Sequence, residues 1–367
     1  MIWLVGMVIV IIVVMIGMIF LTCSIGRLEL IQRAAGGKKW LSRLLAFLIL
    51  LAGFCLFSFL LSVVDAIVIF LHLLIFFLVF RLVFLIVGKI TGKQEKMDWQ
   101  VWLALLTTAV YLGVGYYQCV HVWKTGYTLE SEKPVGELRM ALLSDAHIGT
   151  TFDGEGFGAH LDEIMREEPD LILIPGDFVD DSTTREDMLT ACHALGETNT
   201  KYGVWFAYGN HDKGYYNRRE FSAEELAQAL TENHVHILED EIAVVDDLCI
   251  VGRRDASSAH RAELAALLET VDPEKYIIVL DHEPTDYEKE AATAADLVVS
   301  GHTHGGQLIP LGLVGELFAG NNRTYGYERR NGTDFLVTSG ISNWALHFKT
   351  GTRSEYVIID LIPSNER

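Results

Sequence analysis

The sequence predicts two parts of different kinds: a bundle of about four transmembrane helices, followed by an α/β domain in which helices cover two sheets. Composition gives the first indication, because residues 1–120 are mostly Leu, Ile, Val and Phe, whereas 121–367 have the composition of a soluble domain. Charge gives the second: residues 1–120 carry 9 Lys and Arg against 4 Asp and Glu, a net +5, whereas 121–367 carry 20 against 44, a net −24. The third is a series of five apolar strands in the second part, each ending in a polar cluster.

Three apolar stretches make up the predicted transmembrane region, residues 1–123. Ile2–Thr22 has the length of a membrane-spanning helix, which needs roughly 20 residues. Its basic residues follow it rather than precede it, so we interpret it as a retained helix and not as a signal peptide. Leu44–Val87 is roughly twice as long as one span at about 1.5 Å per residue, so we expect two helices with a turn near Asp65. Trp102–Val120, with Trp and Tyr near its ends, is the fourth candidate.

Basic residues between the spans predict the orientation in the membrane. Two groups lie between predicted spans: Arg27, Arg33, Lys38, Lys39 and Arg43 after the first, and Lys89, Lys93 and Lys96 after the third. Because Lys and Arg accumulate in cytoplasmic loops, we expect both loops in the cytoplasm. Four spans then place the acidic domain outside the cytoplasm, whereas an odd number would place it inside. We interpret the polar segment 124–137 as a linker to a domain at 138–367.

Five predicted strands of the soluble part each lead directly into candidate ligand residues. They are Leu138–Leu143, Leu171–Ile174, Gly203–Ala207, Ile277–Leu280 and Asp296–Val299, and they are followed by Ser144–His147, Pro175–Asp180, Tyr208–Asp212, Asp281–Pro284 and Ser300–Gln307. In open α/β sheets, ligands bind beyond the carboxyl ends of the strands. We therefore expect these clusters to meet at one shared edge.

Amphipathic helical patterns alternate with these strands, at Gly158–Glu168, Arg185–Glu197, Ala223–Asn233 and Ala259–Thr270. Such alternation predicts largely parallel strands. Other short apolar runs follow one another more closely, and we expect them to form antiparallel strands of a second sheet: His236–Leu238, Ile242–Val245, Leu248–Val251, Asp334–Thr338 and Glu355–Leu361. The segment Gly312–Gly332 is not assigned to any element.

The clusters supply carboxylate, amide and imidazole groups but no thiolate. Such donors suit zinc, iron or manganese rather than calcium, and no CxxC pair indicates a thiolate zinc site. By itself, a pair such as His302-Thr303-His304 is more often two ordinary loop histidines than a metal site, but the four clusters upstream favour ligands. The candidate metal ligands are Asp145, His147, Asp177, Asn210, His282, His302 and His304. This set is large enough for two divalent ions that share Asp177, an arrangement common in displacement at phosphorus.

Two further residues complete the predicted site. We expect His211, directly after Asn210, to donate a proton to the leaving oxygen rather than to bind a metal. We expect Asp212 to orient the ring of His211.

The clusters, taken in order, resemble those of the calcineurin-like metallophosphoesterase superfamily. The resemblance rests on Asp145-x-His147, Gly176-Asp177-x-x-Asp180, Gly209-Asn210-His211-Asp212, a His282 shortly before Pro284, and Gly301-His302-x-His304, and it covers about 139–361. The long form Gly301–Leu308 and the ending Thr338–Ser342 look like the membrane-associated bacterial branch. The family implies a two-sheet αββα sandwich.

The resemblance also implies a role for each residue. Asp145, His147, Asp177 and His304 would hold one ion, and Asp177, Asn210, His282 and His302 the other. His211 would be the proton donor or a phosphate contact, and Asp180 would act behind the ligands. Glu283 departs from the family pattern beside His282 and could alter the second ion's site.

These observations predict a membrane-anchored phosphoesterase that uses two divalent ions, with manganese, iron and zinc as candidates. Its predicted substrate is a phosphate ester or pyrophosphate of the cell envelope or of a lipid, and its other partners are membrane lipids. The alternative is a non-catalytic binding or scaffold module on the same fold. Nucleic acid is not expected as a partner, because a net charge of −24 repels phosphate backbones.

Overall fold

The computed structural model describes residues 2–92, 97–214 and 219–364, with 2–11, 97 and 319 described as backbone only. The chain divides into two compact units, Met1–Gly115 and Tyr116–Arg367. The boundary falls inside a helix, so the last turn of that helix belongs to the second unit.

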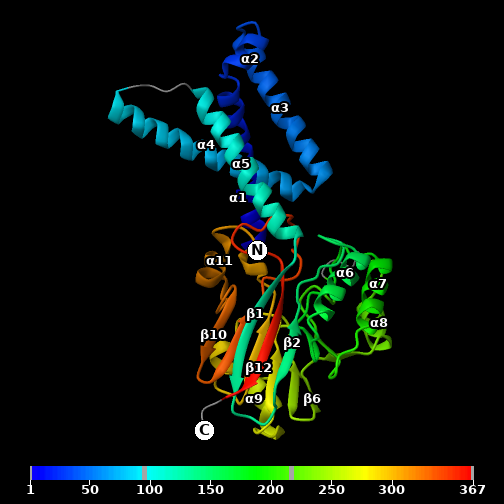
Figure 1. The fold of residues 1–367 in the computed structure, drawn as a ribbon. Coiled ribbons are helices and arrows are strands. Elements are labelled where there is room, and N and C mark those ends of the chain that lie inside the picture. The colour runs from blue at the N-terminus through cyan, green and yellow to red at the C-terminus, as the bar shows by residue number, and fades with distance from the viewer. Residues whose placement is uncertain (1, 93–96, 215–218, 365–367) are drawn as a thin grey trace. The chain divides into compact units, whose positions relative to one another are not determined.

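The first unit is helical (Figure 1). Its helices are α1 (Ile2–Ile25), α2 (Glu29–Ala34), α3 (Lys39–Leu60), α4 (Val63–Thr91) and α5 (Met97–Val120). Three of them contain stretches long and apolar enough to cross a membrane, at Lys39–Leu60, Val63–Thr91 and Asp98–Val120. The part of α1 with described side chains, Ile12–Ile25, is a shorter apolar helix. The start of the predicted first span lies outside the described side chains, so the first crossing, and with it the total of four, stays a prediction.

The turn predicted within Leu44–Val87 lies between α3 and α4. Ser62 caps α4, because its hydroxyl accepts a hydrogen bond from the backbone N–H of Asp65 at 3.0 Å. The same hydroxyl donates to the Asp65 carboxylate at 2.7 Å. The polar pair interrupting the apolar run is therefore a helix cap, which explains why one long hydrophobic stretch becomes two helices.

The second unit contains two six-stranded mixed sheets. The first has the order β1-β12-β2-β3-β4-β5 and the second β10-β11-β9-β8-β7-β6. The strands of the first are β1 (Trp123–Ser131), β2 (Leu138–Leu142), β3 (Leu171–Ile174), β4 (Val204–Ala207), β5 (Val235–Leu238) and β12 (Glu355–Pro363). Those of the second are β6 (Glu241–Val245), β7 (Leu248–Gly252), β8 (Tyr276–Leu280), β9 (Leu297–Ser300), β10 (Gly326–Arg330) and β11 (Thr333–Val337).

Alternation along the strands builds a layered core. On β3, Leu171 and Leu173 face a cluster between the two sheets, whereas Ile172 and Ile174 face helices outside the first sheet. Those helices are α6 (Gly154–Met165), α7 (Arg185–Gly196) and α8 (Ala223–Glu232), while α9 (Leu264–Leu267), η1 (Leu268–Thr270) and α10 (Tyr287–Glu290) cover the second sheet. Strands buried on both faces are apolar throughout, which explains their clear sequence signal. The predicted two-sheet αββα fold is confirmed (Figure 1).

Several details differ from the prediction. The segment interpreted as a linker, 124–137, contains most of β1, which pairs in parallel with β12 from Trp123–Glu355 to Ser131–Pro363. The alternating exposure of β1 is typical of an edge strand with one solvated face, so its polar residues conceal it in the sequence.

Sheet membership is the other difference. We expected β5 and β12 in the second sheet, but both belong to the first: β5 lies parallel to β4, and β12 is antiparallel to β2. The predicted helix Ala259–Thr270 is helical only from Leu264, and the unassigned segment Gly312–Gly332 contains β10. Local patterns identify a strand but do not identify the strand with which it pairs.

The core between the sheets supplies the first test. Ile278→Ala on β8 removes side-chain volume at a fully buried position between the two sheets. We expect a loss of about 2–5 kcal/mol in the free energy of unfolding, because a cavity remains. The thermal unfolding midpoint of the full chain measures it. Val244→Ala, at a position 54% exposed on β6, is the matched control and should leave the midpoint nearly unchanged; equal shifts for the two variants would contradict this core.

Candidate metal centre

The loops that follow five parallel strands meet at one place, and they come from both sheets. From the first sheet come the loops after β2, β3 and β4, and from the second sheet those after β8 and β9. All seven residues predicted as ligands lie on these loops. Their donor atoms form two neighbouring groups.

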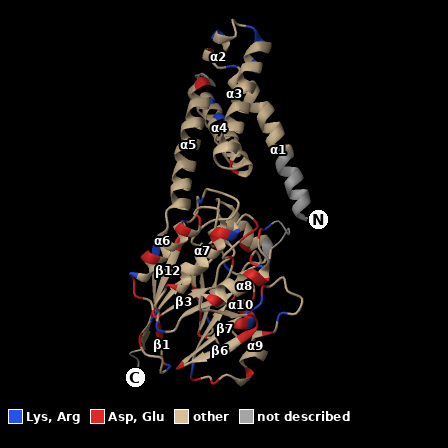
Figure 2. Ribbon diagram, turned by 90° about the vertical axis from the view of Figure 1, so that its right-hand side faces the viewer, with Lys and Arg blue, Asp and Glu red and all other residues tan. Residues whose placement is uncertain are grey.

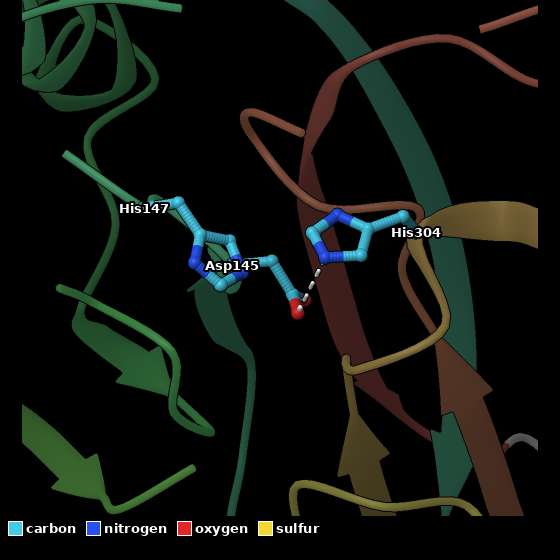
Figure 3. A group of neighbouring side chains, drawn as sticks. All are labelled: Asp145, His147 and His304. Atoms are coloured by element: carbon cyan, nitrogen blue, oxygen red, sulfur yellow. Dashed lines mark ion pairs between the residues drawn. The ribbon is translucent and has the colours of Figure 1, made fainter. Parts of the chain in front are cut away.

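The first group contains Asp145, His147 and His304, whose possible ligand atoms lie within 4.8 Å of one another (Figure 3). The Nε2 atom of His304 lies 3.7 Å from a carboxylate oxygen of Asp145. Both ring nitrogens of His147 and Nδ1 of His304 are buried without a hydrogen-bond partner. Buried polar atoms are normally satisfied. Imidazole nitrogens left without partners beside a carboxylate are what a bound transition-metal ion requires, so this donor set fits a metal.

The second group contains Asp177, His282 and His302. Asn210 joins it, because its side-chain oxygen lies 3.0 Å from Nε2 of His282 and 2.9 Å from Nδ1 of His302. Those two ring nitrogens are themselves 3.3 Å apart. One carboxylate, one amide oxygen and two imidazoles thus point at a common position, as in the first group.

Asp177 connects the two groups. One of its carboxylate oxygens, Oδ2, lies 3.5 Å from Nε2 of His147 in the first group and 3.2 Å from Nε2 of His282 in the second. The other oxygen, Oδ1, accepts a hydrogen bond from the backbone N–H of His211 at 2.8 Å. The position of Asp177 is therefore suited to a carboxylate shared by two ions.

Hydrogen bonds behind the ligands orient two of the histidines. Nδ1 of His282 lies 2.8 Å from the carbonyl oxygen of Pro175 and donates to it, which fixes the ring so that Nε2 is directed at Asp177. Nδ1 of His147 faces a carboxylate oxygen of Asp180 at 3.5 Å. Asp180 is in turn held by the backbone N–H and hydroxyl of Ser182, both at 2.6 Å. This places Asp180 behind His147 rather than among the donor atoms.

Burial sets the electrostatics of the centre. It lowers the pKa of His302 to about 4, with a contribution from His282, and it lowers the pKa of His304 well below its usual value. Both rings are therefore neutral at neutral pH, which is the form that binds a metal. Burial alone would raise the pKa of Asp177, but the neighbouring His282 and His147 more than offset this and lower it. The carboxylate of Asp177 is therefore ionised.

Comparison with known proteins agrees with this geometry. Residues 138–306 match the family described as Calcineurin-like phosphoesterase. An uncharacterized metallophosphoesterase of Aquifex aeolicus is 32% identical over 194 residues, which are 51% of this chain and 71% of that protein. The chain belongs to the calcineurin-like metallophosphoesterases.

Another relative is named as a transmembrane protein. The "Transmembrane protein with metallophosphoesterase domain" of Danio rerio is 29% identical over 286 residues, which are 71% of this chain and 62% of that protein. The chain therefore spans less than two thirds of this relative's length. Among solved structures, a dimetal phosphatase from Danio rerio aligns with a TM-score of 0.36 and 11% identity, covering 55% of this chain and 86% of that one.

Asp212 of this metallophosphoesterase makes contacts that the sequence does not indicate. Its two carboxylate oxygens accept hydrogen bonds from four backbone N–H groups, those of Asp177, Phe178, Val179 and Gly209, at 2.7–3.2 Å. It thus ties the loop after β3 to the loop after β4 and positions Asp177. The prediction that it orients the ring of His211 stays a prediction, whereas these four hydrogen bonds give Asp212 a role in positioning the two loops.

The backbone around the centre is unusually constrained. Five of the seven candidate ligands have φ between 36° and 67°: Asp145, His147, Asp177, His302 and His304. Non-glycine residues rarely adopt this left-handed region, and such strain gathers at functional sites. The loops also approach closely. A Cβ atom on Gly301 would meet the Asp145 carboxylate and the Ser144 hydroxyl, and one on Gly209 would meet Asp177.

Two residues near the centre have no signal in the sequence. Trp344 is 44% exposed, and its ring centroid lies 5.2 Å from that of His211. Lys349 is fully buried and donates to the carbonyl oxygens of Ser339 at 2.5 Å and Gly340 at 3.3 Å. Burial lowers the pKa of Lys349 to about 8. Both lie on the loop between β11 and β12, which no metal-ligand spacing identifies, although the ending Thr338–Ser342 was part of the family resemblance.

The close approach at Gly301 gives a test of the first group. In Gly301→Ala the added methyl group must displace Asp145, so we expect about tenfold or greater loss of metal affinity in a chain that still folds. Titration of the metal-free full chain with Mn²⁺ or Zn²⁺ measures the affinity. Gly126→Ala on β1, where a Cβ meets nothing within 4 Å, is the control and should bind metal like the parent. Unchanged affinity in Gly301→Ala would remove Asp145 from the ligand set.

Proposed function

We propose that this chain is a metal-dependent phosphoesterase that uses two divalent ions to hydrolyse a phosphate ester or pyrophosphate of a lipid or other cell-envelope molecule. The observation that carries the proposal is the position of Asp177, with one oxygen facing histidines of both donor groups at 3.5 and 3.2 Å. Membership of the metallophosphoesterase family supports it.

Each donor group has a role in this proposal. Asp145, His147 and His304 hold one ion, Asn210, His282 and His302 hold the other, and Asp177 contacts both. When bound, the ions neutralise phosphate oxygens and activate a water molecule for attack at phosphorus. Manganese, iron and zinc all suit these oxygen and imidazole donors.

His211 is placed to act on the substrate rather than to hold an ion. Its backbone N–H is fixed by Asp177, and its ring centroid lies 5.0 Å from that of His147. The ring is partly exposed beside Trp344, so it can reach a bound phosphate group. We assign it the hydrogen bond to a phosphate oxygen and the transfer of a proton to the leaving oxygen.

The lipid or envelope substrate follows from the membrane helices. Among the residues that the structure describes, three helices are long and apolar enough to cross a bilayer. An enzyme held at a membrane meets substrates of that membrane at high effective concentration. Acidic residues spread over the second unit disfavour polyanionic nucleic acid by charge repulsion (Figure 2).

Activity tests the enzyme proposal. We expect His211→Ala to lower the turnover of an aryl phosphate with added Mn²⁺ by about 10²–10⁴-fold while metal content stays the same, because the ring transfers a proton but holds no ion. Asp177→Ala should lose metal and activity together. His193→Ala, on the exposed side of α7, is the matched control and should behave like the parent. A parent that binds no transition metal, or equal turnover in all four proteins, would favour a non-catalytic scaffold.

We also propose that the catalytic unit lies outside the cytoplasm. This rests on four crossings and on the basic residues between α1 and α3, namely Arg27, Arg33 and Lys38. In a chain with Cys23→Ala and Cys55→Ala, the exposed Val244→Cys should react with a membrane-impermeant maleimide added to intact cells. Cys192 and Cys249 are buried and should stay unlabelled. Labelling only after the cells are opened would place the unit in the cytoplasm.

A further inference from the structure

Exposed apolar side chains of the catalytic unit gather in one segment beside the metal centre. Among the described residues of 121–367, nine large apolar side chains are exposed. Six lie in one segment, and a seventh, Trp344, is on the neighbouring loop, whereas only Leu189 and Val244 lie elsewhere. The six are Ile309, Leu311, Leu313, Val314, Leu317 and Phe318, of which Phe318 is 80% exposed. A concentration of this kind marks an interaction surface.

The segment is built onto the metal centre. The segment, Ile309–Phe318, contains α11 (Leu311–Val314) and most of the π-helical turn η3 (Gly315–Ala319), and it begins five residues after His304. Gly306, in the turn that follows His304, packs directly against the backbone of Gly312. The hydroxyl of Thr324, beyond the end of the segment, donates to the carbonyl oxygen of Gly312 at 2.9 Å. This hydrogen bond joins the chain on the two sides of η3. Whatever contacts this segment is therefore held next to the candidate metal ligands.

The same unit contains the end of a membrane helix. The last turn of α5, from Tyr116 to Val120, belongs to the catalytic unit. The backbone N–H and hydroxyl of Ser354 donate to the carbonyl oxygens of Gln118 at 2.9 Å and Cys119 at 2.6 Å. Tyr116 and Tyr117 are exposed there, and Tyr117 lies 6.3 Å from Trp123, ring to ring. Exposed Tyr and Trp at the end of an apolar helix mark the level of the lipid headgroups.

One loop joins this helix end to the apolar segment. Residues 344–354 contact α5 through Ser354, and through Phe348, whose ring lies 6.4 Å from that of Tyr116. The same loop contacts the apolar segment: the backbone N–H of Ile309 donates to the Thr350 hydroxyl at 2.9 Å. Figure 1 shows α11 and the C-terminal end of α5 at the same end of the sheets. The apolar segment thus continues the surface on which the membrane helix ends.

The charges of the segment indicate what covers it. Between Leu308 and Asn322 the only ionisable side chain is Glu316, and its carboxylate accepts the backbone N–H of Thr324 at 2.8 Å. The segment has no Lys or Arg for anionic headgroups or for an acidic protein surface. An exposed segment that is apolar and nearly uncharged is best accommodated by the hydrocarbon of lipid chains.

We propose that Ile309–Phe318, together with Trp344, is a membrane-contacting surface that inserts its exposed apolar side chains into the interfacial layer of the bilayer that α5 enters. Amphipathic elements that lie in this layer bury one apolar face to a depth of about 5–10 Å. The contact holds the loop that carries His304, and with it the metal centre, close to the bilayer surface. It does not depend on the activity proposed above and would hold equally for a scaffold.

The test measures the depth of a fluorescent label in the full chain reconstituted into phosphatidylcholine vesicles. In a chain with Cys23→Ala and Cys55→Ala, we introduce Phe318→Cys or the control Val244→Cys, which are both exposed and far apart in the fold, and attach a polarity-sensitive fluorophore. Cys119, Cys192 and Cys249 are buried and should not react. Thermal unfolding of each labelled chain verifies that it is folded.

We expect doxyl-labelled phosphatidylcholine to quench the label at position 318 at least about twofold and to leave the label at 244 unquenched. Leu313→Cys should behave like Phe318→Cys, which guards against a local effect of one substitution. Equal quenching at 318 and 244 would overturn the proposal. So would a blue-shifted but unquenched label at 318, since that result means coverage by protein, either another part of this chain or a second copy.

Discussion

The carboxylate of Asp177, which lies between the two donor groups, is the constraint on which the rest of the centre depends. Its Oδ2 faces histidines from both donor groups, while Oδ1 accepts the backbone N–H of His211. Its own backbone N–H donates to Asp212 at 2.8 Å. A carboxylate fixed at this many points cannot rotate to favour one group over the other. The fully buried Asp212 therefore helps to determine the geometry of the centre, because it holds the backbone of Asp177 in place.

The strain in the ligand loops has the same origin. Both sheets direct the carboxyl ends of parallel strands at a single point, so five loops must turn within a very small space. These loops turn within few residues because their backbone is left-handed at Asp145, His147, Asp177, His302 and His304. Glycines occupy the positions where the backbones nearly touch. The glycines and ligand residues of the motifs therefore reflect the close packing of the loops as well as the chemistry of the site.

The sequence alone predicts much of this structure, because strands buried on both faces are apolar throughout. The strand Leu171–Ile174 was predicted without error, and all seven candidate ligands lie in the two donor groups or beside them. Prediction from the sequence fails where a feature depends on residues far away in the chain. The partners of β5 and β12 depend on the whole sheet, and the polar alternation of β1 is indistinguishable from a linker. The direction of the Asp212 side chain and the approach of Trp344 to His211 are properties of the folded chain alone.

Each candidate ion position draws on both sheets. Asp145 and His147 come from the first sheet and His304 from the second, while Asp177 and Asn210 come from the first and His282 and His302 from the second. Cations bound there would be held by residues of both sheets and would link the two sheets to each other. By thermodynamic linkage, each occupied position then adds to the stability of the native state according to the ratio of free cation to its dissociation constant. Maturation of this unit would then be coupled to metal supply in the compartment where it folds.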